Sequence, residues 1–465
     1  MLPTVPYGAI AEILSALRAV LGDRLTSSAD VRRHHGTDEG WLAPMAPEAV
    51  AYPFSTDVVA RLVAICAAER VPVIPFGAGT SFEGGVAALH GGLCLDLSGM
   101  TRILEVNEAD LDCTVEAGVL RTQLEEHLGR RGLFFAVDPG ADATIGGMAA
   151  TRASGTQTVS YGAMREAVLA VTAVMADGRV IRTARRARKS SAGYDLTHLL
   201  VGSEGTLGVI TEVTLRVYGI PEASAVGICA FATLGGAVET AMATMQIGIR
   251  PARIELLDEV QIAACNAYSG LDLPALPTLL MEFHGTPAGV TEQADLVREI
   301  AAAHGGGGWQ SSSEQAERRR LWKIRHDAYY AARAQRAGVR GMPTDVCVPI
   351  SRLAECILET RRDLDASGIH APIMGHVGDG NFHVTLTFDP DDPVELAACR
   401  AFHDRLVRRA LAMGGTCTGE HGIGYGKQRY LVEEHGEAAV DVMRAVKQAL
   451  DPLNIMNPGK VLPGL

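Results

Sequence analysis

The sequence predicts an α+β protein of more than one domain. Its 465 residues exceed a single ordinary hydrophobic core, so two or three domains are expected. In the first half, strand-like runs alternate with three glycine-rich segments; from about Ala223, strand-like runs alternate with Ala-rich helical stretches, and no internal repeat is visible. We therefore divide the chain into residues 1–222, residues 223–415 and a C-terminal segment, 416–465.

The composition is that of a well-buried, enzyme-like chain. It is 47% hydrophobic and 21% charged, and the net charge of −12 argues against nucleic acid as a partner. Nine cysteines are scattered without a C-x-x-C, so disulfide scaffolding, iron–sulfur ligation and c-type haem attachment are unsupported. There is neither an obvious secretion signal nor a run of about 20 apolar residues. We therefore expect a cytoplasmic protein.

Apolar periodicity and turn residues predict the individual elements. The expected helices are 9–22, 55–69, 121–131, 235–247, 259–267, 287–303, 314–337, a helix from Leu353, and 438–450. The expected strands are 71–76, 92–97, 103–107, 112–117, 225–232, 253–257, 278–283 and 341–350. The run 305–308 is expected to be a loop.

The first glycine-rich segment, from Gly77 to Gly85, follows the strand 71–76 directly. Glycines let backbone N–H groups approach phosphate oxygens, so this loop is a candidate anion nest. It is not a dinucleotide fingerprint, because Phe82 holds the position of the third glycine. A tight strand connection is the alternative. The second segment, 138–162, leaves room for a flat cofactor against the backbone; the third, 201–211, again leads into a strand.

Two histidines flank a tight-turn signal, Asp379-Gly380. This dipeptide is preferred in a two-residue type I′ hairpin, which would place His376 opposite His383 with Cβ atoms ~4.5–5.5 Å apart. Two imidazoles at that distance can bind one ion, and Glu420 would add a carboxylate. Non-haem iron oxygenases and metal hydrolases share this ligand set, and a surface hairpin with incidental histidines is the plain alternative.

Four segments in order, PFGAGTSFEGG, DPGADATIGGMAATRASGT, GSEGTLGVIT and NPGK, resemble the flavin-binding segments of the vanillyl-alcohol-oxidase type of FAD enzymes. Together with GHVGDGNFH and TGEHGIG, they resemble the FAD-dependent D-lactate dehydrogenase branch over about the whole chain. The resemblance implies a two-part PCMH-type FAD-binding domain and an α/β cap domain with an antiparallel sheet. It also implies that the C-terminal segment returns to the FAD domain and completes the active site.

The resemblance implies non-covalent FAD, since the first loop has no histidine where some relatives attach the flavin. The pyrophosphate is expected on Phe76, Gly77, Ala78, Gly79, Thr80 and Ser81. The ribityl chain and isoalloxazine are expected along Pro139, Gly140, Ala141, Thr144, Ile145, Gly146, Gly147, Ser154, Gly155 and Thr156. The adenosine side is expected along Glu204, Gly205, Gly208 and Ile210, and Asn457 belongs to the fourth segment.

The implied reaction is oxidation of a D-2-hydroxy acid to the 2-oxo acid, with hydride passing to flavin N5. His421 is the expected base, since an imidazole pKa near ~6.5 lies close to working pH. Arg325 is expected to bind the substrate carboxylate through its planar guanidinium. Asn381 is expected to orient the substrate, or else to be only a turn residue. One divalent ion, Zn, Mn or Fe, is expected on His376, His383 and Glu420.

The residues before Asp345 bear on the substrate. Relatives acting on 2-hydroxyglutarate carry a lysine there, whereas Gly341–Thr344 has none, although Arg340 could compensate. This favours D-lactate or a longer monocarboxylic analogue. The alternatives are a D-2-hydroxyglutarate or glycolate dehydrogenase, or an inert FAD-binding subunit of a larger dehydrogenase. Electrons are expected to leave to a carrier protein, a quinone or oxygen. A membrane-bound acceptor would place the protein at the periphery of a membrane.

Overall fold

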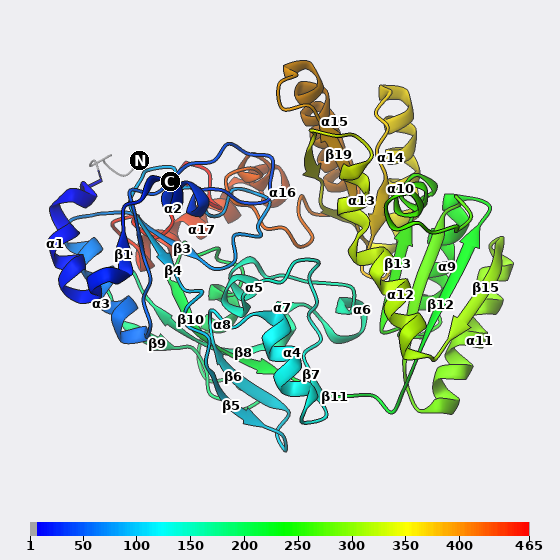
Figure 1. The fold of residues 1–465 in the computed structure, drawn as a ribbon, viewed down its shortest axis with the longest axis horizontal. Helices are drawn as coiled ribbons and strands as arrows, with labels where there is room; N and C mark the ends of the chain where they lie inside the picture. Colours follow the sequence, from blue (N-terminus) through cyan, green and yellow to red (C-terminus); the bar gives the residue numbers. More distant parts are fainter. Residues whose placement is uncertain (1–6, 465) are drawn as a thin grey trace. The chain divides into compact units, whose positions relative to one another are not determined.

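The computed structural model describes residues 7–464, and they form two compact units. Of the described residues, the first unit comprises 7–154, 163–220 and 420–464, and the second comprises Gly155–Gly162 and Pro221–Gly419. The mixed helix and sheet class expected from the sequence is confirmed (Figure 1). No helix among the described residues is long and apolar enough to cross a membrane.

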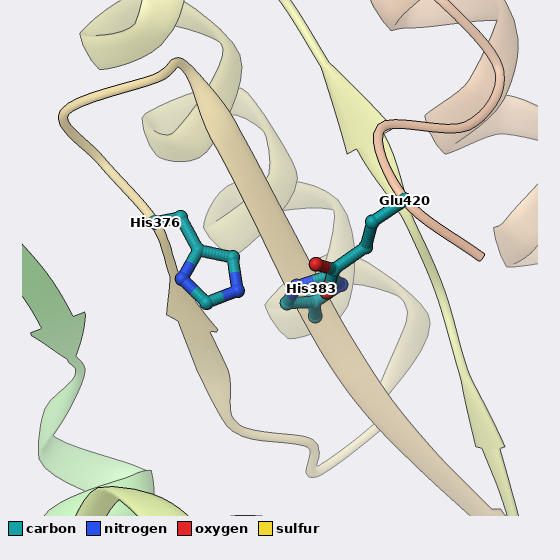
Figure 2. Close-up of side chains that lie close together, drawn as sticks. All are labelled: His376, His383 and Glu420. Carbon is teal, nitrogen blue, oxygen red and sulfur yellow. The ribbon is translucent and has the colours of Figure 1, made fainter. Parts of the chain in front are cut away.

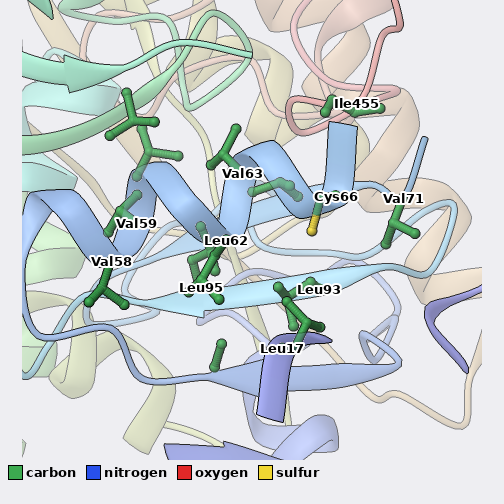
Figure 3. Close-up of a cluster of buried hydrophobic side chains, with 14 of the residues drawn as sticks. Leu17, Val58, Val59, Leu62, Val63, Cys66, Val71, Leu93, Leu95 and Ile455 are labelled. Carbon is green, nitrogen blue, oxygen red and sulfur yellow. The ribbon is translucent and has the colours of Figure 1, made fainter. Parts of the chain in front are cut away.

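The first sheet of unit one has the order β1 (Leu25–Thr26), β2 (Ala49–Ala51), β4 (Leu93–Asp96), β3 (Val73–Phe76). Strands β2, β3 and β4 pair in parallel. Helix α1 (Ile10–Leu21) ends at Gly22, whose φ of 57° suits glycine, and α3 (Thr56–Ala68) begins at Ser55, whose hydroxyl accepts from Val58 N. Both helices contribute to a buried cluster that includes Leu17, Leu62 and Leu95 (Figure 3).

The substitution Leu62→Ala tests this core. Leu62 is fully buried, so removing its side chain is expected to lower the free energy of unfolding by about 2–5 kcal/mol. Leu104 is 40% exposed and provides a matched control, because Leu104→Ala removes the same atoms from the surface. Urea denaturation followed by circular dichroism measures both variants. Equal shifts of the two midpoints would contradict the packing described here.

The second sheet of unit one is antiparallel. Its order is β5 (Ile103–Asn107), β6 (Asp112–Glu116), β10 (Val209–Arg216), β8 (Val168–Val174), β9 (Val180–Arg182). Helices α4 (Arg121–Gly129) and α5 (Ile145–Thr151) share its buried cluster. After α16 (Leu431–His435) and α17 (Glu437–Leu450), the tail runs beside β3: Val73 N donates to Ile455 O, and Asn457 N donates to Val73 O. The C-terminal tail therefore joins the first sheet next to the first glycine-rich loop.

Unit two is built on one antiparallel sheet. Its order is β15 (Gly306–Ser312), β12 (Ala223–Phe231), β14 (Thr278–Gly285), β13 (Arg253–Leu257), β18 (Ile373–Gly375), β19 (Asn381–Phe388), β16 (Arg340–Pro343), and β17 (Val346–Cys347) also pairs with β19. The helices that pack with the sheet are α9 (Leu234–Gln246), α10 (Glu259–Ser269), α11 (Pro287–Ala303), α12 (Gln315–His326), α13 (Ala328–Ala334) and α15 (Pro393–Ala412), and α14 (Leu353–Ser367) packs against α9 and α15. The antiparallel cap sheet expected from the sequence is therefore present.

Three elements of unit two differ from the expected ones. The run 305–308 lies mostly in the edge strand β15, where one side of the backbone pairs with β12 and glycines are tolerated. The expected helix 314–337 is two helices, which meet at Asp327. The expected strand 341–350 is two short strands, β16 and β17, separated by Thr344 and Asp345. Both interruptions lie in stretches that supply polar contacts near the histidine hairpin.

Candidate active site

The histidine hairpin has a wider turn than the one predicted. Met374, rather than His376, lies opposite His383. A type I′ turn needs positive φ at both central residues, but of Asp379 and Gly380 only Gly380 has it, at 80°. The direct His376–His383 pairing is therefore wrong. The physical reason is burial: the wider loop places Val377 fully inside the protein, and it packs Gly378 so tightly that a Cβ would lie 2.6 Å from Ile254.

The two imidazoles nevertheless lie together, with ring centroids 5.6 Å apart. A register change of two residues preserves the face on which a side chain lies, because side chains alternate with a period of two. Glu420, the first residue after unit two, adds a carboxylate (Figure 2). One ligand atom from each of these three residues lies within 4.8 Å of the others. The structure thus brings together the three residues that the sequence predicted as metal ligands.

The partners of the two rings fix which nitrogen faces an ion. His376 Nδ1 lies 2.6 Å from a carboxylate oxygen of Glu255, and His383 Nδ1 lies 2.9 Å from the carbonyl oxygen of Thr344. Both partners only accept hydrogen bonds, so Nδ1 donates in each ring, and the neutral imidazole presents its lone pair at Nε2. Metal-binding histidines are held in this way. Two imidazole nitrogens and one carboxylate suit zinc, manganese or iron.

Glu255 is a residue that the sequence analysis missed. It is fully buried on β13, and its second oxygen accepts a hydrogen bond from Arg325 Nε at 2.6 Å. Burial raises the pKa of the Glu255 carboxyl, but the His376 imidazole and the Arg325 guanidinium outweigh burial and hold the pKa below its usual value. The available signal was a lone carboxylate among Ile254, Leu256 and Leu257 in a buried strand.

Arg325 and Asn381 have partners within the protein. Arg325 Nε donates a hydrogen bond to the Glu255 carboxylate, whereas the Nη groups of Arg325 donate to no acceptor in the described part of the chain. Asn381 is buried and donates both amide protons, to Asp345 at 2.7 Å and to the carbonyl of Val346 at 2.8 Å. Its buried Oδ1 accepts no hydrogen bond from any residue that the structure describes. Asn381 can therefore contact a substrate only through Oδ1.

Asp345 links the hairpin to the chain that leads to Glu420. Its fully buried carboxylate accepts from Asn381 on one oxygen and from the hydroxyl of Thr418, at 2.7 Å, on the other. A Cβ at Gly419 would lie 2.2 Å from Asn381 Nδ2, so glycine is required there. These contacts hold the two residues before Glu420 against the strand that carries His383. Asp345 was used in the sequence analysis only as a reference point for substrate.

His421 lies beside both a metal ligand and the first glycine-rich loop. Its Nε2 is 3.7 Å from the Glu420 carboxylate, and its ring centroid is 4.8 Å from that of Phe82. The other oxygen of Glu420 accepts from the hydroxyl of Ser154 at 2.5 Å, so a predicted flavin-lining residue also orients a predicted metal ligand. Both Glu420 and His421 side chains are mostly buried.

The four predicted flavin segments, apart from Gly155 and Thr156 of the second, lie in unit one and converge there. Asn457 Nδ2 donates to the carbonyl oxygens of Gly85 and Glu204, at 3.1 and 2.8 Å. A Cβ at Gly77 would lie 2.3 Å from Thr144 Oγ1, so the first and second segments also touch. Within residues 7–464, the backbone N–H groups from Gly77 to Ser81 donate to no other group of the chain. A row of such donors beside glycines fits a diphosphate.

Several predicted cofactor residues can act only through their backbone. The Phe76 side chain is buried against the His35 ring, and Ile145 and Ile210 face the core. Thr144 caps α5. Three glycines are packed against other residues: a Cβ on Gly146 would meet Ala117, one on Gly205 would meet Pro75, and one on Gly208 would meet the carbonyl oxygen of Val174. At Gly140, by contrast, a Cβ would meet no described atom within 4 Å. Gly140 therefore borders open space, as a cofactor-lining position requires, and its neighbours Pro139 and Ala141 are partly exposed.

Comparisons with known proteins cover nearly the whole chain. The profile of the FAD binding domain matches residues 47–184, and that of the C-terminal domain of FAD linked oxidases matches residues 220–461. A probable mitochondrial D-lactate dehydrogenase of Danio rerio is 50% identical over 458 residues, which span 98% of this chain and 92% of that protein. The mitochondrial D-lactate dehydrogenase (cytochrome) of Arabidopsis thaliana is 45% identical over 454 residues, which span 97% and 80% of the two chains.

Solved structures confirm the PCMH-type fold. The 4-ethylphenol oxidase from Gulosibacter chungangensis superposes with a TM-score of 0.82 at 17% identity, over 97% of each chain. p-Cresol methylhydroxylase superposes with a TM-score of 0.78 at 17% identity, over 97% of this chain and 96% of that one. At such identity these likenesses concern the fold alone. Together with the matching profiles and the full-length relatives, they show that the chain belongs to the FAD-linked oxidases, in the branch of the D-lactate dehydrogenases.

Proposed function

We propose that this FAD-dependent oxidoreductase oxidises a D-2-hydroxy monocarboxylate, D-lactate or a longer analogue, to the 2-oxo acid. The observation that carries the proposal is the cluster of His376, His383 and Glu420, in which an acceptor faces Nδ1 of both rings, so that each neutral imidazole has its lone pair on Nε2. The names of the relatives from Danio rerio and Arabidopsis thaliana support D-lactate as the substrate. A metal hydrolase or a non-haem iron oxygenase would not need the flavin segments that accompany this cluster.

The cofactors would be held by residues that already converge. The backbone N–H groups from Gly77 to Ser81 would bind the pyrophosphate of non-covalent FAD, and Pro139–Ala141 would border the flavin. His376, His383 and Glu420 would bind one ion of Zn, Mn or Fe. When bound, FAD accepts the hydride equivalent from the substrate Cα, and the divalent ion polarises the substrate hydroxyl and carboxylate.

The chain's own residues would then bind the substrate and move its proton. His421 takes the hydroxyl proton on its imidazole, and Phe82 and Glu420 restrain that ring. Arg325, fixed through Nε by Glu255, offers its Nη groups to the substrate carboxylate. Asn381 offers Oδ1 as an acceptor. The proton thus leaves through an imidazole while the carboxylate is held in place, which leaves the Cα hydrogen as the group to be transferred.

The substrate test is anaerobic bleaching of the bound flavin. D-Lactate is expected to bleach it, with D-2-hydroxyglutarate at least about tenfold slower, since Gly341, Met342 and Pro343 of β16 offer no lysine for a second carboxylate. L-Lactate and glycolate are compared in the same experiment. Metal analysis of the same sample identifies the ion. Faster bleaching by D-2-hydroxyglutarate or glycolate would establish those alternatives, and no bleaching by any acid would establish an inert subunit.

We also propose that the electrons leave to an external acceptor. The relative from Arabidopsis thaliana is named for a cytochrome, which favours a carrier protein over oxygen. Reoxidation of the reduced enzyme by cytochrome c, a soluble quinone analogue or oxygen compares the three acceptors directly. Both relatives are named as mitochondrial, whereas the sequence led us to expect a cytoplasmic protein. Fractionation of the source cells tests the two locations.

A further inference from the structure

Glu204 is held in an unusual place and conformation. It is not a glycine, yet its φ is 51°, in the left-handed region that side chains rarely adopt. Its backbone N–H donates to Ala150 O at 2.8 Å, and its carbonyl oxygen accepts from Asn457 Nδ2 at 2.8 Å. The second and third glycine-rich segments and the C-terminal NPGK segment therefore meet at this residue, and their contacts fix the direction of its side chain.

That direction is the loop immediately after His421. One oxygen of the Glu204 carboxylate accepts from Ile423 N at 2.7 Å, and the other accepts from Gly424 N at 2.8 Å. Gly422 has a φ of 82°, and a Cβ on it would lie 2.8 Å from the same carboxylate. The carboxylate thus fills the inside of a turn that begins one residue after His421.

The far end of this turn is held by a different residue. Glu83 O accepts from Tyr425 N at 3.0 Å, and its carboxylate pairs with the buried Lys427 at 3.2 Å. Glu83 follows Phe82, whose ring lies against His421. The imidazole is therefore restrained on one side by Phe82, while the backbone that carries it is restrained by Glu204. Each of the two N–H groups has its own carboxylate oxygen as acceptor, an arrangement that a primary amide, with one oxygen and one NH2 group, does not supply.

We infer that Glu204 is a positioning residue for His421: its carboxylate receives the N–H groups of Ile423 and Gly424 and thereby sets the direction of the imidazole that takes the substrate proton. This inference rests on the proposed function. Glu204 touches neither substrate nor the reacting atoms in this account. Glu204 acts through the turn that contains Ile423 and Gly424. Its contacts therefore order the glycine-rich segments and His421 together.

The substitution Glu204→Gln tests this role. The glutamine side chain has the same shape but one acceptor oxygen, so its NH2 group would face one of the two backbone N–H groups. We expect the limiting rate of flavin reduction by D-lactate to fall about 10–100-fold, with the substrate Kd changed less than about threefold. The solvent isotope effect on that rate is expected to rise, because proton transfer to a misdirected imidazole becomes slower. Full FAD content is expected.

Glu116→Gln is the matched control. Glu116 is another buried carboxylate of unit one that accepts a backbone N–H, from Arg102 at 2.8 Å, and it has no contact with the His421 loop. It should change stability alone, without altering the rate or the isotope effect. A merely structural role for Glu204 predicts that both variants behave alike.

Stopped-flow reduction with D-lactate separates the outcomes. If the wild-type flavin is not reduced by any D-2-hydroxy acid, the proposed function fails, and this inference falls with it. If the wild type is reduced and Glu204→Gln is reduced at the same rate and isotope effect, the inference alone is overturned. If Glu204→Gln does not retain FAD, Gly422→Ala decides, because its added Cβ would lie 2.8 Å from the Glu204 carboxylate and would displace the same turn. A wild-type rate in FAD-loaded Gly422→Ala would then overturn the inference.

Discussion

Replacing His421 with alanine is expected to slow flavin reduction by D-lactate about 10²–10⁴-fold, the usual contribution of a positioned general base. FAD is expected to stay bound, because the amide-rich loop Gly77–Ser81 is untouched. The metal is also expected to stay, because the three ligand residues remain. Anaerobic stopped-flow measurement of flavin absorbance, together with FAD and metal analysis of the same sample, checks the three expectations together.

His435→Ala is the control for this substitution. His435 ends α16 in the same C-terminal segment, its side chain is 39% exposed, and it should leave the reduction rate unchanged. Added imidazole should restore part of the rate to His421→Ala, since a free base can enter the space left by the ring. A His421→Ala variant that keeps FAD and metal and is reduced at the wild-type rate would show that another group takes the proton.

Much of the fold could be predicted because its signals are local. Ser55 begins α3 and Gly22 ends α1, and these residues act within one helical turn of themselves. The glycine-rich segments are also readable, because a loop that presents bare N–H groups needs small residues in consecutive positions. Local rules of this kind predicted most helices and strands to within a few residues. They also selected the three residues that gather into the candidate metal site.

The details that could not be predicted depend on distant contacts. Asp379-Gly380 has the local preference for a two-residue turn, but burial of Val377 and the close packing of Gly378 against Ile254 favour a longer loop. Glu255 reaches His376 across 121 residues of sequence, so spacing cannot reveal it. The partners of Arg325 and Asn381 are equally remote. The family resemblance marked Arg325 as a substrate contact, and Asn381 was expected either to orient the substrate or to be only a turn residue. The structure shows that each side chain is also held by a buried carboxylate.

Loss of a metal ligand is expected to slow turnover more than loss of Glu255, the residue that holds the ligand His376 through Nδ1. His383→Ala removes one of three donor groups, so we expect the purified protein to contain little metal and to reduce its flavin with D-lactate more than about 10²-fold slower. Glu255→Gln keeps every ligand but replaces the charged acceptor on His376 Nδ1 with a neutral amide. A weakening of metal affinity by about 10–100-fold is expected. Excess metal should refill the site and restore part of the activity, because the same substitution also removes the acceptor of Arg325 Nε.

The difference between the His383→Ala and Glu255→Gln variants distinguishes a metal site from a cluster of structural histidines. Chelation should inactivate the wild type, and Zn, Mn or Fe should restore it, whereas His370→Ala, at an exposed position shortly before β18, should change neither metal content nor rate. If the histidines only stabilised the hairpin, His383→Ala would lower the unfolding midpoint, and chelation would have no effect. Undiminished turnover after chelation would therefore exclude the metal role. Rescue of Glu255→Gln by excess metal, but not of His383→Ala, would in turn show that Glu255 acts through His376, because only an intact set of ligands can be refilled.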